Sequence, residues 1–234
     1  MMSGTRTVSD DEADIRLDRW FRRHFPGVPQ SAIQKLCRTG QVRVDGRRAE
    51  AATRLLSFGC SRGDEVFSLR KYFPAAAIRG IDVDPRNIEL CVARLASANS
   101  RATTFVTASD TQGETSGSYD AIFCLAVLCL GDLTASGAQR SDPQLKFEDF
   151  DRMVTDFARC LKTQGILVLH TTNFRFCDSS VAADFDVVLE ADAAQLAPDV
   201  LFDRDNKLMT GARYHSVAFR KHANVAVDSN NTVR

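Results

Sequence analysis

The stretch LLSFGCSRGDEVFSL, residues 55–69, carries the clearest fold signal in the chain. It joins a short apolar run to a loop of small residues, and then to an amphipathic pattern with helical spacing. A strand, a glycine loop and a helix in that order form the ligand-binding turn of open α/β sheets, where glycines let a nucleotide approach the backbone. The spacing here is Gly59-x-x-x-Gly63, and Ser61 replaces the middle glycine of G-x-G-x-x-G, so the loop alone is a weak signal.

Strand and helix patterns alternate through the rest of the chain. The sequence predicts strands at 55–58, 77–84, 103–109, 120–128, 165–172, 185–192 and 214–221, and helices at 65–73, 85–99 and 147–162. Because the first five strands are nearly continuous apolar runs, they predict a parallel sheet that is buried on both faces. The last two strands, separated by a long irregular connection, predict an antiparallel edge hairpin. The expected fold class is therefore α/β, with a Rossmann-like, doubly wound, mostly parallel sheet and an antiparallel terminal strand over residues 55–221.

Basic residues gather at the front of the chain. Residues 1–54 contain 11 Lys and Arg against 7 Asp and Glu, and the remainder has the opposite excess. This asymmetry predicts a separate first unit that faces a polyanion, with a solvated basic surface as the alternative. Segments 15–25 and 28–40 have helical spacing, and 41–50 has the pattern of a hairpin with an Asp-Gly turn.

Composition excludes several classes of protein. No apolar run approaches the roughly 20 residues of a membrane span, and the N-terminus lacks the apolar core of a signal peptide. The seven cysteines are scattered and form no C-x-x-C, which predicts reduced thiols, no disulfide framework and no metal site. We therefore expect a cytoplasmic protein without a membrane partner, with a disordered tail over 1–14 and a flexible tail over 222–234.

Acidic residues near the glycine loop indicate the ligand. Asp82, at the end of the second predicted strand, follows the loop by about twenty residues and can accept hydrogen bonds from a ribose diol. Alternatively, Asp82 and Asp84 only cap the helix that begins at Pro85, and we assign that role to Asp84. Asp64 and Glu65 open the helix after the loop, where they disfavour a pyrophosphate and suit a cation such as the sulfonium of S-adenosylmethionine. The charges therefore favour a methyl donor over a dinucleotide.

Four segments in order, FGCSRGDEVFSL, GIDVDPRN, YDAIFCLAVL and LKTQGILVLHTTN, resemble class I S-adenosylmethionine-dependent methyltransferases over about residues 54–221. The G-C-S-x-G-D/E-E form of the loop is similar to that of chemotaxis-receptor methyltransferases. The resemblance implies S-adenosylmethionine as the cofactor. It places the methionine portion at Gly59, Cys60, Ser61 and Gly63, the ribose at Asp82, the adenine at Val83, Ser109 and Asp110, and the reacting centre beside Cys124 and Leu125. Ser57 occupies a position where many members carry an acid, so the methionine amine is assigned to Asp64 or Glu65 instead.

The segment RLDRWFRRHFPGVPQSAIQKLCRTGQVRVDGRRAEAATRL resembles the small α+β S4-like RNA-binding domain, in the form found at the front of large-subunit pseudouridine synthases. The resemblance covers residues 15–54 and implies RNA, ribosomal RNA included, as a partner. The residues expected to face RNA phosphates are Lys35, Arg38, Gln41, Arg43 and Arg47. The catalytic segment of the synthases does not follow, so pseudouridine synthesis is not expected. The S4-like domain lacks its last strand, and the helices that usually precede the first methyltransferase strand are absent, so both halves are shortened near residues 50–55.

His170, at the end of the predicted strand 165–172, is the expected catalytic base if the methyl acceptor has a proton to lose. A histidine that is merely hydrogen-bonded at a strand end is the alternative, and Asp132 and Asn173 are weaker candidates for positioning the acceptor. Three functions remain open from the sequence. The chain is expected to be an RNA methyltransferase. One alternative is a small-molecule or protein methyltransferase that carries a basic appendage. The other is an RNA-binding fusion with an inactive methyltransferase remnant.

Overall fold

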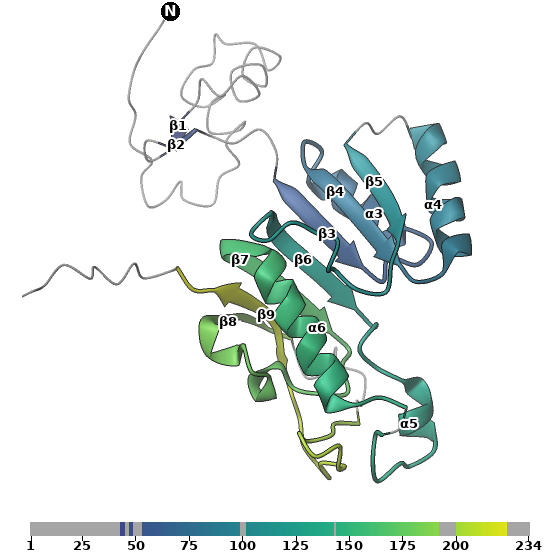
Figure 1. Ribbon diagram of the computed structural model, residues 1–234, viewed down its shortest axis with the longest axis vertical. Helices are drawn as coiled ribbons and strands as arrows, with labels where there is room; N and C mark the ends of the chain where they lie inside the picture. The colour runs from purple at the N-terminus through teal and green to yellow at the C-terminus, as the bar shows by residue number, and fades with distance from the viewer. Residues whose placement is uncertain are drawn as a thin grey trace, which may run out of the picture. The chain divides into compact units, whose positions relative to one another are not determined.

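The computed structural model describes residues 53–98, 102–142, 144–191 and 200–223, together with two short strands near residue 45 (Figure 1). The chain divides into two compact units, residues 1–52 and 53–234, and each is described by itself. In the first unit, β1 (Arg43–Val44) pairs antiparallel with β2 (Arg47–Arg48). The hairpin predicted at 41–50 is therefore confirmed, whereas the helices predicted at 15–25 and 28–40 lie outside the described residues.

A seven-stranded sheet forms the centre of the second unit, in the order β5-β4-β3-β6-β7-β9-β8. Its strands are β3 (Arg54–Phe58), β4 (Ala77–Asp82), β5 (Thr103–Thr107), β6 (Tyr119–Leu125), β7 (Leu161–His170), β8 (Phe185–Glu190) and β9 (Ser216–Lys221). The strands from β5 across to β7 are parallel to their neighbours, and β9 runs antiparallel to both β7 and β8. The doubly wound, mostly parallel sheet is confirmed. The antiparallel edge pair predicted for the last two strands is also confirmed, with β8 at the edge and β9 between β8 and β7.

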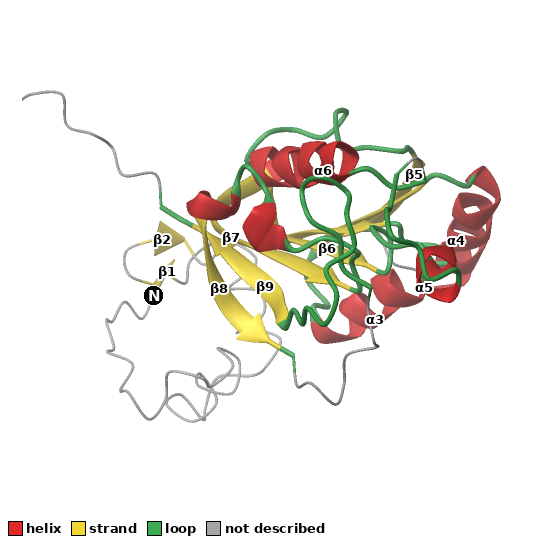
Figure 2. Ribbon diagram, turned by 90° about the horizontal axis from the view of Figure 1, so that it is seen from below, coloured by secondary structure: helices red, strands yellow, loops and turns green. Residues whose placement is uncertain are grey.

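Helices cover both faces of this sheet (Figure 2). The described helices are α3 (Asp64–Tyr72), α4 (Pro85–Ala98), the short α5 (Gly131–Ala135) and α6 (Phe147–Cys160), followed by 3₁₀ turns at Phe176–Asp178 and Ala182–Asp184. Helix α6 lies on one face and α3 on the other. Helix α6 ends two residues before its predicted end, because Leu161 is already extended. The sequence did not predict α5 or the 3₁₀ turns, which are too short to produce a periodic pattern.

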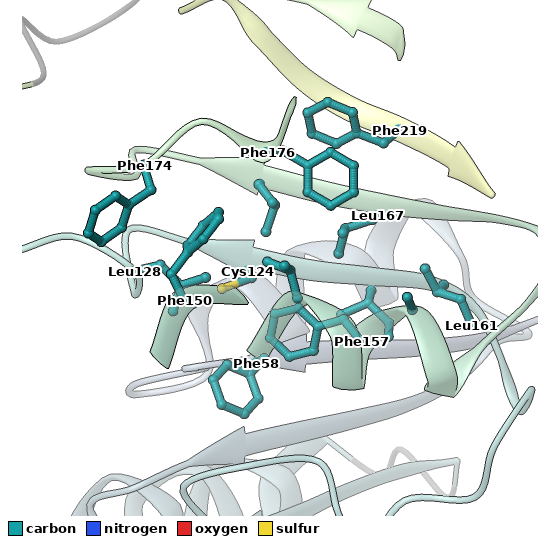
Figure 3. Packing of buried hydrophobic residues seen from close by; sticks show 14 of the residues in the cluster. Phe58, Cys124, Leu128, Phe150, Phe157, Leu161, Leu167, Phe174, Phe176 and Phe219 are labelled. Atoms are coloured by element: carbon teal, nitrogen blue, oxygen red, sulfur yellow. The ribbon is translucent and has the colours of Figure 1, made fainter. Parts of the chain in front are cut away.

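The larger hydrophobic core lies between α6 and the sheet (Figure 3). Phe147, Phe150, Val154 and Phe157 recur every three or four residues, so they form one buried face of α6. The Phe157 ring meets Phe58 of β3 edge to face at 5.0 Å between centroids. Each such fully buried side chain stabilises the fold by about 1.5–3 kcal/mol. This core packs α6 against the central strands, whose carboxyl ends carry the loops of the site.

Candidate cofactor and methyl-acceptor site

The predicted glycine loop follows β3 at the point where the order of strands reverses, between β3 and β6. Gly59, Ser61 and Gly63 adopt left-handed backbone conformations, with φ of 71°, 47° and 84°. The amides of Gly59 and Cys60 both donate to the carbonyl oxygen of Ile81, at 2.8 and 2.9 Å. The loop therefore turns back sharply over the end of β4 instead of running outward.

Both glycines are also required for space. A Cβ atom on Gly59 would lie 2.2 Å from Cγ2 of Val127, in the loop after β6. A Cβ atom on Gly63 would lie 2.9 Å from Sγ of Cys91 and 3.0 Å from the Phe67 ring. Val127 thus packs directly against the glycine loop, a contact that sequence spacing gives no means of predicting.

Asp82 joins the loop to the start of α4. Its Oδ2 accepts a hydrogen bond from the Ser61 amide at 2.7 Å, and its Oδ1 accepts from the Asp84 amide at 2.9 Å and from Nδ2 of Asn87 at 3.1 Å. Asp84 in turn accepts from the Arg86 amide at 2.9 Å, which confirms its predicted role as the helix cap. The side chain of Asp82 therefore links the glycine loop to the start of α4, whether or not it also binds a ribose. The contact of Asn87 with Asp82 was not predicted from the sequence.

The two acids that open α3 have different environments. Asp64 is 84 % exposed and forms an ion pair with Nη1 of Arg94 at 2.8 Å. Glu65 is partly buried, and burial raises its pKa, although the nearby Ser57 hydroxyl lowers it in part. The buried Oε1 of Glu65 and the buried Oγ of Ser57 have no hydrogen-bond partner. One carboxylate oxygen of Glu65 thus lies buried without a partner in hydrogen-bonding geometry, which fits a ligand that brings donors, such as an ammonium group, and favours Glu65 over Asp64.

The residues expected at the adenine lie at the same edge of the sheet. Val83 follows β4 and is 70 % exposed, which is unusual for valine and leaves a flat apolar surface available. The end of β5 is held beside it, because the Ala108 amide donates to the carbonyl of Asp82 at 3.0 Å. Ser109 is exposed, and Asp110 accepts from the Gln112 amide at 3.0 Å in a tight turn.

The structure separates Cys124 from Leu125. The Cys124 thiol is fully buried in the core under α6, where burial raises its pKa (Figure 3). Successive strand residues face opposite sides of the sheet, so a contact of Cys124 with the cofactor stays a prediction that concerns its backbone. Leu125 is 37 % exposed and lies opposite His170, at the paired ends of β6 and β7. The imidazole Nδ1 of His170 is 2.9 Å from Oγ1 of Thr171.

Asn173, a weaker candidate for positioning the methyl acceptor, has a structural role in the fold. Its side chain is 3 % exposed, its Oδ1 accepts from the Leu130 amide at 2.7 Å, and its Nδ2 donates to the carbonyl of Val200 at 2.7 Å. The amide of Asn173 therefore ties the loop after β6 to the segment at Val200, between β8 and β9. Asp132, in α5, is exposed. Of the expected RNA contacts, Arg43 and Arg47 lie on the two strands of the hairpin, and Lys35, Arg38 and Gln41 lie outside the described residues.

A cavity of about 410 Å³ lies at the opposite edge of the sheet, away from these residues. It is lined by Ser116, Gly117, Arg159, Leu161, Lys162, Thr163 and Lys221. Its cations already have partners within the protein, as Lys162 binds both oxygens of Asp120 at 2.9 Å and Lys221 donates to a carbonyl at the end of α6. In the part of the chain that the structure describes, no cluster of three metal-binding side chains occurs and no helix is long and apolar enough to span a membrane.

Comparison with known proteins identifies the class of this site. Residues 56–167 match a family model described as a methyltransferase domain. This part of the chain is accordingly an S-adenosylmethionine-dependent methyltransferase domain, and S-adenosylmethionine is its cofactor. The buried Oε1 of Glu65 and the glycine loop fit that cofactor, which carries an ammonium group and has to approach the backbone.

Curated relatives match a short part of the chain. A ribosomal large subunit pseudouridine synthase C from Salmonella typhi is 39 % identical over 59 residues, which are 25 % of this chain and 17 % of the relative. Its namesake from Haemophilus ducreyi is 46 % identical over 44 residues, 19 % of this chain and 14 % of the relative. The chain therefore spans less than a fifth of the length of these relatives.

Solved structures with a similar fold include PKMT2 from Rickettsia typhi in complex with AdoHcy, at 19 % identity over 50 % of this chain and 20 % of that one, with a TM-score of 0.40. A phospholethanolamine N-methyltransferase 2 from Haemonchus contortus is 17 % identical over 51 % of this chain and 24 % of that one, with a TM-score of 0.41.

Proposed function

We propose that the protein transfers a methyl group from S-adenosylmethionine to RNA, and that residues 15–54 bring the RNA to the methyltransferase unit. The RNA part of the proposal is carried by the match to two ribosomal large subunit pseudouridine synthases, which agrees with the S4-like pattern of residues 15–54. The excess of basic residues in that segment supports the same partner.

Each part of the cofactor has a candidate partner in the chain. The loop from Gly59 to Gly63 would hold the methionine portion, Glu65 its ammonium group, Asp82 the ribose, and Val83 the adenine. When bound, S-adenosylmethionine supplies an electrophilic methyl group on a sulfonium centre. Methyl transfer is an in-line displacement, so the chain acts chiefly by positioning its two substrates. His170 would take a proton from an acceptor that has one to lose.

Transfer of label from S-adenosylmethionine with a radioactive methyl group tests this function. The full chain is incubated separately with the RNA, protein and small-molecule fractions of one cell lysate. We expect label in the RNA fraction, and we expect ribonuclease to release it. Label confined to protein or small molecules would refute RNA as the acceptor. It would support the alternative of a small-molecule or protein methyltransferase with a basic appendage.

The paired acids of α3 supply matched variants for the same assay. Glu65→Gln should weaken S-adenosylmethionine binding at least tenfold, about 1.4 kcal/mol, because it removes a charge-assisted hydrogen bond to the ammonium group. Asp64→Asn should bind like the wild type, because that carboxylate is exposed and already paired with Arg94. Isothermal titration calorimetry measures both, and equal losses would contradict the assignment of the ammonium group to Glu65.

Salt dependence tests the RNA-binding role of the first unit. Replacing Arg43 and Arg47 with alanine should reduce the slope of log K against log salt by about 2, as expected for the loss of two phosphate contacts. Arg86→Ala is the control, since its side chain is 87 % exposed and lies in the other unit. An unchanged slope in the double variant would count against this surface.

A further inference from the structure

The neighbouring strands β6 and β7 end in the same unusual way. Leu125 and His170 are the last paired residues, and the residues that follow them, Ala126 and Thr171, both have a left-handed backbone with φ of 56°. The Ala126 amide donates to the carbonyl of His170 at 2.8 Å, so the two turns are held together.

Thr171 is the more strained of the two residues. A β-branched residue with positive φ is a genuine outlier, because its Cβ crowds the backbone. Backbone strain of this kind clusters at active sites and ligand-binding sites. Here its effect is visible in the geometry. Successive residues of a regular strand point to opposite faces, so Thr171 could not reach its predecessor if the strand continued. The left-handed turn places its Oγ1 2.9 Å from Nδ1 of His170.

We propose that Thr171 is a positioning residue, which accepts a hydrogen bond from Nδ1–H of His170 and so leaves Nε2 unprotonated and free to receive a proton. The two imidazole nitrogens are not equivalent, and the partner of one decides the state of the other. A hydroxyl oxygen has two lone pairs and can accept this bond. A proton leaving the methyl acceptor would pass to Nε2, and the imidazolium so formed keeps its Nδ1–H on Thr171. This inference rests on the proposed function for its purpose, but the tautomer itself is measurable without any acceptor.

The experiment is long-range ¹H–¹⁵N NMR on the full chain labelled with ¹⁵N-histidine. His170→Gln identifies the signals of His170, since the chain has only four histidines. The wild type should show the pattern of a neutral imidazole protonated at Nδ1. Thr171→Ser, which keeps the hydroxyl, should preserve that pattern. Thr171→Val, which has the same shape without the hydroxyl, should lose it.

Thr171→Gly separates the proposed effect of Thr171 on the His170 tautomer from a contribution of Thr171 to stability. Glycine adopts a left-handed backbone without strain, so this variant should melt no lower than the wild type and should still lose the tautomer preference. Either of two results would overturn the proposal: protonation at Nε2 in the wild type, or an unchanged tautomer in both Thr171→Val and Thr171→Gly. If the tautomer behaves as expected and RNA takes no label, the proposed function fails and the role of Thr171 stands.

Discussion

Replacing Gly59 with alanine tests whether Val127 closes on the cofactor loop. The added methyl group would lie 2.2 Å from Cγ2 of Val127, far inside van der Waals contact. The same change places a side chain on a backbone with φ of 71°. A left-handed backbone costs a residue with a side chain about 1–2 kcal/mol, and overpacking costs about 1–3 kcal/mol. Gly59→Ala should therefore lower the free energy of unfolding by about 2–5 kcal/mol.

A double variant separates these two causes. Val127→Ala alone should cost about 1 kcal/mol, since a partly buried valine loses only part of its burial energy. In Gly59→Ala/Val127→Ala the two contacts with the Cγ atoms are removed, a Cβ–Cβ distance of 3.3 Å is left, and the backbone strain remains. The double variant should therefore be more stable than the sum of the single effects predicts, by about 1–3 kcal/mol.

Urea unfolding of the full chain, followed by far-UV circular dichroism, measures the four free energies of this cycle. Gly113→Ala is the matched control, because no atom lies within 4 Å of its added Cβ and its backbone is not left-handed. Additivity within about 0.5 kcal/mol would refute the contact with Val127. A Gly59→Ala protein as stable as Gly113→Ala would refute the whole argument.

Three further predictions concern the same unit. Glu65→Gln should raise the Tm of the free protein at pH 7, because burial raises the pKa of Glu65 and makes its ionised form unfavourable in the fold. The gain in Tm should vanish below pH 4.5, the ordinary pKa of a glutamate, where the carboxyl group is neutral in both the folded and the unfolded chain. Melting curves at pH 7 and at about pH 4 check this. Asp82→Asn should lower the free energy of unfolding by about 1–3 kcal/mol, because both oxygens of Asp82 accept hydrogen bonds and the NH₂ group of asparagine would face a donor instead. Faster hydrogen exchange at the Ser61 amide would report the loosened loop, and unchanged exchange would contradict it. Of the cysteines that the structure describes, Cys177 is exposed and should be alkylated first in the native protein. Cys60 should react only after unfolding, because burial, with smaller effects from Cys91 and Asp82, raises its pKa to about 12. Peptide mapping after timed alkylation distinguishes the two, and early labelling of Cys60 would contradict its burial.

The arrangement of the sheet could be predicted from local pattern. Apolar runs in β3, β4 and β6 have the length and continuity of strands buried on both faces, and the amphipathic runs between them have helical spacing. The ends of elements were less accurate, because a helix and a strand can compete for the same apolar residues, as they do at Leu161. The short helix α5 had no periodic signal to detect.

The candidate site could be predicted only in part. Gly59, Gly63 and Asp82 stand at positions that local spacing marks, since the loop and the acid each lie next to a strand that periodicity reveals. The sequence did not indicate a side-chain direction at Cys124, because a strand that is apolar on both faces does not show which residues face the ligand edge.

The sequence by itself determined the class of fold, the position of the glycine loop and the acidic character of its ligand site, because these depend on residues close together in the chain. Only the tertiary structure decided between Asp64 and Glu65, placed Val127 on Gly59, and brought the end of β6 beside His170. Each of these depends on the burial or contact of residues brought together from different strands and helices. Such contacts are created when the sheet assembles, and no local pattern in the chain encodes them.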